Sequence, residues 1–355
     1  MRTNFLYLYA TFTFLALLLS PASAASTKRD ALLDYVSSLQ VSDSGFQDTS
    51  SGSVTVEATA DASMIYLLLG ESVDYKNELI YYIQRCQSEN GGFSATPGTS
   101  PSLEMTFHAI RAIQALELNQ SWINGNIDRW KILNYTLTAF NESYESLIFP
   151  TSDDLYDFTI TELDALYSLI YISSFLETIP SFNVTYVTLS LVNLQYSNGS
   201  YSSFDIATRS IKTLFLINDL FGGYFALAPS SSEGAITFIN AFKEEEGGYS
   251  NTLNGDPTLT SSYQAVSTIK LFTPPYEDPL TSSFVLDKQS QNGGFLSGES
   301  PSVKNTWMAI SCLFYLDSIG ELLAPNIPQT EGFVLLPITS VYAIIALIII
   351  RLKKR

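Results

Sequence analysis

Gln87-Ser88-Glu89-Asn90-Gly91-Gly92-Phe93 is the stretch that decides the fold, because its pattern of glutamine, glycine and aromatic residue recurs along the chain. Copies stand at Gln195, Gly199 and Tyr201, at Gln289, Gly293 and Phe295, and, with Lys243 in place of the glutamine, at Gly247 and Tyr249. A looser copy ends at Phe46, and a degenerate one lies around Phe149. Recurrence at intervals of roughly 50 residues indicates a repeat protein.

A second shared pattern follows the turns. Residues 101–109 align with residues 301–309, and residues 257–265 form a third clear copy. Each copy begins with proline and a serine or threonine two to three residues before an apolar series at helical spacing, which is typical of a helix N-terminus. Each repeat is therefore predicted to consist of a helix, a Gly-aromatic turn and a second helix.

The predicted helices form two sets. Those that enter the turns are expected at about 28–40, 74–87, 127–142, 182–196, 232–243 and 279–290. Those that leave the turns are expected at about 54–69, 101–118, 158–176, 204–219, 258–272 and 302–319. The sequence thus predicts an all-α fold of six helical hairpins.

Apolar residues in the end hairpins distinguish a closed ring from an open solenoid. An open solenoid needs polar terminal caps. Here Met64–Leu69 in the first hairpin and Cys312–Leu316 in the last are as apolar as the middle of the chain. We therefore expect an (α/α)6 toroid, with the helices that leave the turns forming the inner ring.

Both ends of the chain have the features of targeting segments. Residues 1–24 combine Arg2, an apolar run and a small-residue site, which predicts a signal peptide cleaved near Ala24. Residues 333–350 carry no charge and are long enough to cross a bilayer core of about 30 Å, so they predict a transmembrane helix.

These ends imply an arrangement for the rest of the chain. The basic tail, residues 351–355, predicts a cytoplasmic C-terminus. The toroid, residues 25–322, would then lie outside the cell membrane on a proline-containing stalk, residues 323–332. The expected protein is a single-pass membrane protein with an extracellular ring.

The composition narrows the classes of partner. The chain has 35 acidic and 18 basic residues, a formal net charge of −17, which disfavours nucleic acid as a partner. The only cysteines, Cys86 and Cys312, fall on non-neighbouring hairpins, so two free, buried thiols are expected. Glycosylation sequons are present at Asn119, Asn134, Asn141, Asn183 and Asn198.

The repeated turns on paired helices resemble those of terpene cyclases and protein prenyltransferase β subunits, the prenyltransferase and squalene oxidase repeat family. The resemblance covers residues from about 28 to 320. It implies the α/α toroid fold, and it implies activity less strongly, because related rings include non-catalytic modules.

The catalytic motifs that the resemblance implies are missing. Protein prenyltransferases of this kind hold zinc with an Asp, a Cys and a His, but this chain has one histidine, His108, and no matching Asp-x-Cys pair. The nearest match to the acid motif of triterpene cyclases, residues 152–157, has the wrong spacing and reads as an acidic loop. No thioester motif is present. We therefore expect no metal and no cofactor.

Polar residues at matching positions of the inner helices predict the lining of a central cavity. One column contains Glu57, Glu104, Ile160, Asp205, Thr260 and Lys304; one turn later come Asp61, His108, Asp164, Arg209, Gln264 and Met308. The candidate cavity-lining residues are Glu57, Asp61, Glu104, His108, Asp164, Asp205, Arg209 and Gln264. Within this set, Glu104 and His108 could pair, as could Asp205 and Arg209.

Two kinds of function are the main candidates from the sequence, and a purely structural envelope component is a third possibility. The first is a non-catalytic binding or interaction module for an extracellular protein, glycan or small molecule. The second is a divergent enzyme, either prenyltransferase-like or a hydrolase that uses opposed carboxylates such as Glu57 or Asp61 and Asp164. The absent family motifs favour the binding module.

Overall fold

The computed structural model describes residues 26–41, 44–116, 127–148, 156–178, 180, 183–221, 231–298 and 300–325. Within it, Ser26–Ala324 form one compact unit. The predicted signal peptide, transmembrane helix, tail, most of the stalk, the turn at Phe149 and the sequon at Asn119 lie outside the described residues. No helix in the described ranges is long and apolar enough to span a membrane.

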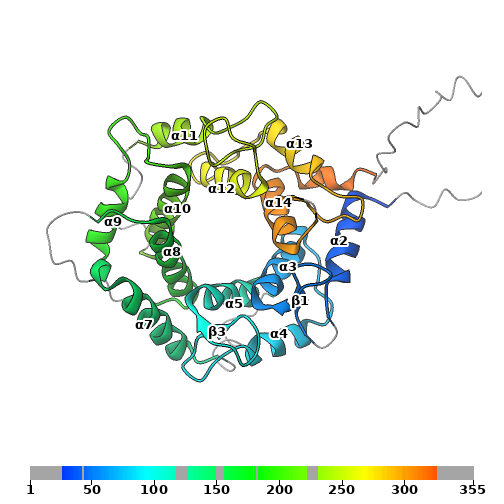
Figure 1. The fold of residues 1–355 in the computed structure, drawn as a ribbon, viewed down its shortest axis with the longest axis horizontal. Helices are drawn as coiled ribbons and strands as arrows, with labels where there is room; N and C mark the ends of the chain where they lie inside the picture. The colour runs from blue at the N-terminus through cyan, green and yellow to red at the C-terminus, as the bar shows by residue number, and fades with distance from the viewer. Residues whose placement is uncertain are drawn as a thin grey trace, which may run out of the picture. The chain divides into compact units, whose positions relative to one another are not determined.

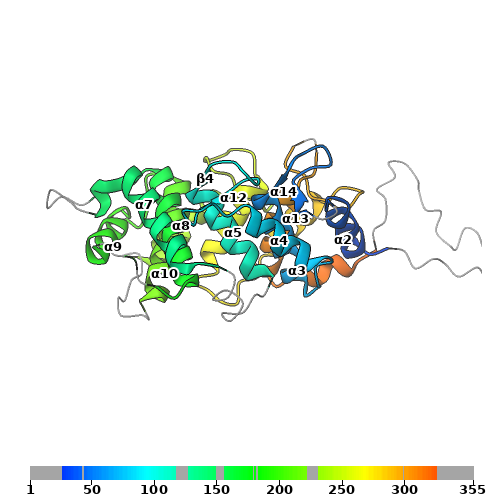
Figure 2. The same cartoon turned by 90° about the horizontal axis from the view of Figure 1, so that it is seen from below.

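The described residues form two concentric rings of helices (Figure 1). The inner ring consists of α3 (Val56–Leu69), α5 (Leu103–Ala115), α8 (Ile160–Phe175), α10 (Phe204–Leu220), α12 (Leu259–Ile269) and α14 (Val303–Tyr315). The outer ring consists of α2 (Lys28–Ser38), α4 (Lys76–Arg85), α7 (Arg129–Ile148), α9 (Val184–Asn193), α11 (Ser232–Asn240) and α13 (Pro279–Asp287). Figure 2 shows the ring edge-on, with both sets of helices in one layer. The predicted α/α toroid is confirmed.

Serine or threonine begins every inner helix in the described ranges. The N-cap residues are Thr55, Ser102, Thr159, Ser203, Thr258 and Ser302. In each case the hydroxyl accepts a hydrogen bond from the backbone N–H three residues later, which stabilises a helix by about 1 kcal/mol. The cap of α8 is Thr159, not the acidic stretch that ends at Asp157.

In two repeats the glutamine of the turn also binds the next hairpin. Gln195 donates to the carbonyl of Gly199 (2.9 Å) and to that of Ser231 (2.8 Å), which caps α11. Gln289 donates in the same way to the carbonyls of Gly293 (3.1 Å) and Lys28 (2.9 Å). The repeat pattern is therefore a device that joins neighbouring hairpins as well as a turn.

The structure contains two short pairs of strands, which the all-α prediction did not include. β1 (Phe46–Gln47) pairs antiparallel with β2 (Val54–Thr55), and β3 (Phe93–Ser94) with β4 (Pro101–Ser102). The sequence predicted helices from about 54 and 101, but these residues are extended because they run beside the chain that leaves the turn. The pairs are two residues long, so the glycines stay in turns and the helices keep their order.

The first and last hairpins meet and close the ring. The backbone N–H of Lys28 donates to the carbonyl of Ala324 (3.0 Å), and that of Val303 to the carbonyl of Asp48 (2.9 Å). Nζ of Lys304 on α14 lies 2.8 Å from Oε1 of Glu57 on α3. Figure 1 shows α14 beside α3 on the inner side. The predicted closure is confirmed.

The predicted thiols and sequons have clear positions. Cys86 and Cys312 are free and buried, as predicted. Asn134, Asn183 and Asn198 are exposed, whereas Asn141 is half-buried. The use of these four sequons stays a prediction.

Candidate functional site

The inner ring encloses a cavity of about 930 Å³. Side chains from all six inner helices line it, together with α7. Seven aromatic residues provide much of the lining: Phe107, Tyr135, Tyr167, Tyr171, Tyr263, Trp307 and Tyr315. The volume lies within the range of small-molecule sites, which is about 300–1,000 Å³.

Several of these aromatic side chains form two groups, and the rings within each group are in contact. The ring of Phe107 lies 5.0 Å from that of Tyr171 and 5.9 Å from that of Tyr167, edge to face in both cases. The rings of Tyr263 and Trp307 lie 4.9 Å apart. Burial raises the pKa of Tyr167 and of Tyr263, so these phenols stay neutral and can donate hydrogen bonds.

Arg111 on α5 is the buried charge at the centre of the site. Its Nη1 donates to Oδ1 of Asp61 (3.0 Å) and lies 3.1 Å from Nδ1 of His108. Its guanidinium carbon lies 4.1 Å from the centroid of the Trp307 ring. Nη2 of Arg111 and Nε1 of Trp307 are buried and have no hydrogen-bond partner in the described part of the chain. Two donor nitrogens on cavity-lining residues are thus unused, and both are almost fully shielded by the surrounding side chains.

Burial shifts the pKa values of Asp61 and His108, the two titratable side chains that contact Arg111. It raises the pKa of Asp61 to about 6, although the charge of Arg111 acts in the opposite direction. It lowers the pKa of His108 well below the usual value, and the charges of Arg111 and Lys304 add to that effect. His108 is therefore neutral near pH 7. Because Nδ1 accepts from Arg111, its proton is on Nε2, 3.9 Å from Oε1 of Glu57.

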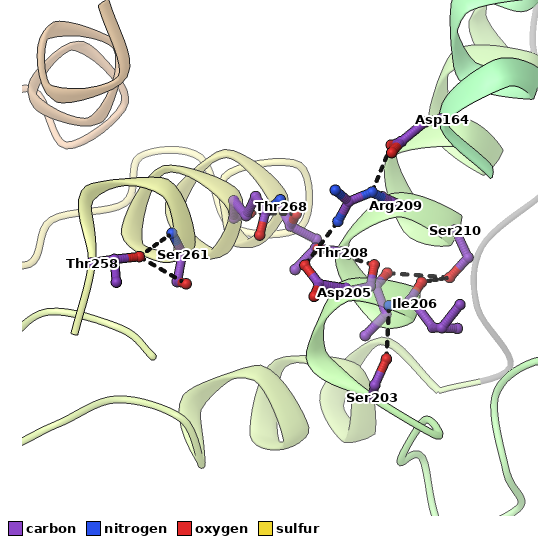
Figure 3. A network of polar contacts seen from close by, with 12 residues as sticks. Asp164, Ser203, Asp205, Ile206, Thr208, Arg209, Ser210, Thr258, Ser261 and Thr268 are labelled. Atoms are coloured by element: carbon purple, nitrogen blue, oxygen red, sulfur yellow. Dashed lines mark hydrogen bonds and ion pairs between the residues drawn. The ribbon is translucent and has the colours of Figure 1, made fainter. Parts of the chain in front are cut away.

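A second charged cluster lies across the cavity, on α8, α10 and α12. Nε of Arg209 lies 2.5 Å from Oδ1 of Asp164, and its Nη1 lies 2.8 Å from Oδ1 of Asp205 (Figure 3). The amide of Gln264, oriented to satisfy its neighbours, donates to Asp205 (3.2 Å) and accepts from Arg209 (3.1 Å). The positive charge of Arg209 is therefore compensated by two carboxylates, Asp164 on α8 and Asp205 on α10.

Some of the candidate residues predicted from the sequence line the cavity, and others do not. Glu104, His108, Asp164, Arg209 and Gln264 line the cavity. Glu57, Asp61 and Asp205 are not part of its lining, and each is tied to a basic side chain beside it. Asp205 and Arg209 pair as expected, whereas His108 contacts Arg111 and faces Glu57 rather than Glu104.

The deeper part of the site lies beyond the two polar columns predicted from the sequence. Arg111, Tyr167, Lys212 and Ser311 line the cavity three residues after the second polar column. Extending that column by one more helical turn would have found them. The aromatic residues carry no such signal, because an aromatic residue on an inner helix is equally compatible with the core.

The donor set does not fit a zinc ion. In the described ranges, no three His, Cys, Asp or Glu side chains lie close enough to hold a metal. Nδ1 of His108 is bonded to Arg111, Cys86 lies at the end of the outer helix α4, and Cys312 is fully buried outside the cavity lining. No step of the chemistry is therefore assigned to zinc.

Comparison with known protein families identifies the family to which this ring is similar. The family model of the prenyltransferase α/α toroid domain matches residues 2–139, 128–298 and 183–335, which together span most of the chain. The chain belongs to this family.

Individual members of the prenyltransferase α/α toroid family differ widely from this chain. It is 31% identical to the geranylgeranyl transferase type-1 subunit beta of Arabidopsis thaliana over 102 residues, which is 28% of this chain and 27% of that protein. The matched part thus spans about a quarter of that relative.

Two solved structures share the toroid. One is the Candida albicans protein geranylgeranyltransferase-I complexed with GGPP, with a TM-score of 0.55 and 16% identity over 76% of this chain and 85% of that one. The other is a variant of the type II terpene cyclase MstE from Scytonema in complex with merosterolic acid A, with a TM-score of 0.50 and 13% identity over 83% and 96% of the two chains. At these identities the likeness concerns the fold alone.

Proposed function

We propose that the ring is a binding module that takes a small, mostly apolar molecule with an acceptor oxygen into its central cavity. The observation that carries the proposal is the pair of buried, unused donors at the aromatic lining, Nη2 of Arg111 and Nε1 of Trp307. A buried polar group without a partner costs about 1–3 kcal/mol. A rotation of either side chain toward the cavity would let a ligand oxygen accept from these donors and recover that cost, while the aromatic rings hold the apolar body.

The proposed binding module would be anchored to the membrane with its ring outside the cell. The uncharged segment 333–350 and the tail 351–355 support a single membrane anchor, and residues 1–24 support export of the ring. The ring would then meet extracellular ligands. Protease protection of the tail, with the ring digested in intact cells, would support this placement, and the reverse pattern would contradict it.

A titration with two matched probes tests the binding role. 1-Anilinonaphthalene-8-sulfonate has an aromatic body and an anionic acceptor group, and N-phenyl-1-naphthylamine has the same body without the sulfonate. We expect the sulfonate probe to bind at one saturable site. Trp307→Phe, which keeps a ring and loses Nε1–H, should weaken its binding about 5- to 30-fold. The neutral probe should be affected little.

Trp130→Phe is the matched control, because Trp130 on α7 is 70% exposed. It should leave both affinities unchanged. Equal sulfonate affinity in the wild type and in Trp307→Phe would contradict the proposal, as would the absence of a saturable site.

A second candidate function is an enzyme acting on an isoprenoid substrate. It is favoured by the aromatic lining, because the similar Candida albicans ring was solved with GGPP and the Scytonema ring with a terpenoid product. Incubation of the purified protein with GGPP separates this candidate from the binding module. Release of diphosphate or conversion of the isoprenoid, measured by mass spectrometry against a protein-free control, would favour the enzyme; saturable binding of the sulfonate probe without any conversion would favour the binding module.

A further inference from the structure

Lys212 on α10 is a cavity residue that the charged clusters leave without a partner. It lines the cavity, and its Nζ lies 4.8 Å from the centroid of the Tyr263 ring. It makes no hydrogen bond or ion pair within the described part of the chain. Other lysines differ in this respect: Lys243 lies 2.6 Å from Asp278, Lys304 2.8 Å from Glu57 and Lys270 3.5 Å from Asp317.

Arg209, one turn earlier on the same helix, explains why Lys212 has no carboxylate. Both carboxylates at this side of the cavity, Asp164 and Asp205, are bonded to the guanidinium of Arg209 (Figure 3). A guanidinium presents a planar set of donors that binds carboxylates with better geometry than an ammonium does. The ammonium group of Lys212 therefore contacts the face of the Tyr263 ring and lines the cavity.

The surroundings of Lys212 favour the uncharged amine. Burial lowers its pKa to about 7, and the positive charge of Arg209 adds to the effect. Cys312 on α14 and Asp164 on α8 act in the opposite direction, and the Tyr263 ring on α12 also favours the ammonium form. A large share of Lys212 is thus neutral at pH 7, whereas an ordinary lysine is almost fully protonated.

We propose that Lys212 is a reactive amine that condenses with the carbonyl group of a small aldehyde or ketone in the central cavity. The inference rests on the proposed function, since it specifies the acceptor oxygen of the arriving ligand as a carbonyl oxygen, which the buried donors would hold until it leaves as water. The ring would then capture its ligand by a reversible covalent bond.

The reaction balances without an oxidant or a reductant. The lone pair of Nζ attacks the carbonyl carbon, a C–N bond forms, and the π electrons of the C=O bond move to oxygen. The two protons of the neutral amine and the carbonyl oxygen leave as one water molecule. An imine, C=N, remains between Lys212 and the ligand, and water reverses the reaction.

Cys312 is the other nucleophilic side chain near Lys212, and it fits this role poorly. It is fully buried and is not among the cavity-lining residues. Burial also raises the pKa of its thiol, so it carries almost no thiolate near pH 7. The amine is therefore the group that a ligand in the cavity meets.

Reductive trapping tests the inference on the purified full-length protein. Benzaldehyde and sodium cyanoborohydride are added between pH 5 and 9, and peptide mass spectrometry measures the benzyl group on each lysine. We expect Lys212 to be modified roughly 100-fold faster than Lys270 at pH 7. Its rate should level off above about pH 7, whereas the rate at an ordinary lysine, with a pKa of about 10.4, should still be rising at pH 9.

Two variants isolate the signal. Lys212→Arg keeps a cation and should remove the fast phase, whereas Lys270→Arg should leave it unchanged. Modification of Lys212 no faster than that of Lys270, or a fast phase that survives Lys212→Arg, would overturn the inference.

Titration of the same sample with 1-anilinonaphthalene-8-sulfonate separates this failure from that of the proposed function. Saturable binding without fast trapping would overturn the imine and leave the binding module standing. Fast trapping without saturable binding would support the reactive amine and contradict the donor-based ligand site.

Discussion

One glycine in each repeat turn decides how closely neighbouring hairpins approach. Gly293 has a φ of 94°, and a Cβ there would lie 2.0 Å from the carbonyl oxygen of Ala31 on α2. Gly247 is in the same position against Leu280, where the distance would be 2.3 Å. The glycine therefore serves both the turn and the contact between two helices.

Gly293→Ala should destabilise the protein by about 3 kcal/mol or more, since it adds backbone strain and a clash at the point where the ring closes. Gly70→Ala is the matched control: φ is 68°, and a Cβ there would meet no atom within 4 Å. It should cost only about 1–2 kcal/mol. Urea unfolding measures both, and equal losses would show that the helix contact at Gly293 is unimportant.

Asp61 gives the stability a pH dependence with a defined sign. Its pKa is raised to about 6 in the folded protein, against about 3.9 when unfolded, so the folded state holds this proton more tightly. Stability from this group is present below about pH 4 and is lost as pH rises to about 6.

Compared with Asp61→Asn, the wild type should lose about 2–3 kcal/mol of stability between pH 4 and pH 6. Urea unfolding at a series of pH values measures the difference, in which the neutral His108 cancels to first order. A difference that is constant over this range would mean that Arg111 keeps Asp61 ionised throughout.

At the scale of elements, a hydroxyl on each of α3, α5, α12 and α14 binds the backbone of the turn that precedes the helix. The backbone N–H of Phe93 donates to Oγ1 of Thr106 (3.0 Å), and that of Phe295 to Oγ1 of Thr306 (3.1 Å). Thr59 and Ser262 do the same for Phe46 and Tyr249, each at 3.0 Å. These bonds hold the repeat aromatic over the start of its own inner helix.

Thr106→Val should leave the N–H of Phe93 buried without a partner and cost about 1–3 kcal/mol. Thr252→Val, at an exposed loop position, is a control that should change stability by less than about 0.5 kcal/mol. Thermal or urea unfolding measures the difference. Equal stability of the two variants would show that another acceptor replaces Thr106.

The helices could be predicted because the repeat supplied both their period and their order. The strand pairs could not, since two extended residues leave no alternation in the sequence and depend on which segment runs alongside. For the site, the polar columns around His108 and Arg209 marked the right face of the inner helices. They did not show that Asp61 is withdrawn behind Arg111, because that depends on side-chain contacts between α3 and α5.

At the scale of the molecule, closure creates the cavity. Lys28 and Ala324 meet at the ends of the ring, and α3 packs against α14, so every inner helix has two inner neighbours. The space that remains is lined by aromatic rings and holds the unused donors of Arg111 and Trp307. In the described part of the chain, the closed ring therefore surrounds a cavity that is open to solvent at its mouth.

The most direct test of the account is a crystal structure of the purified protein with 1-anilinonaphthalene-8-sulfonate. We expect the probe inside the ring, with its sulfonate oxygens within hydrogen-bond distance of Nη2 of Arg111 and Nε1 of Trp307 and its rings against Tyr263 and Phe107. An empty cavity with the probe bound on the outer helices would contradict the account.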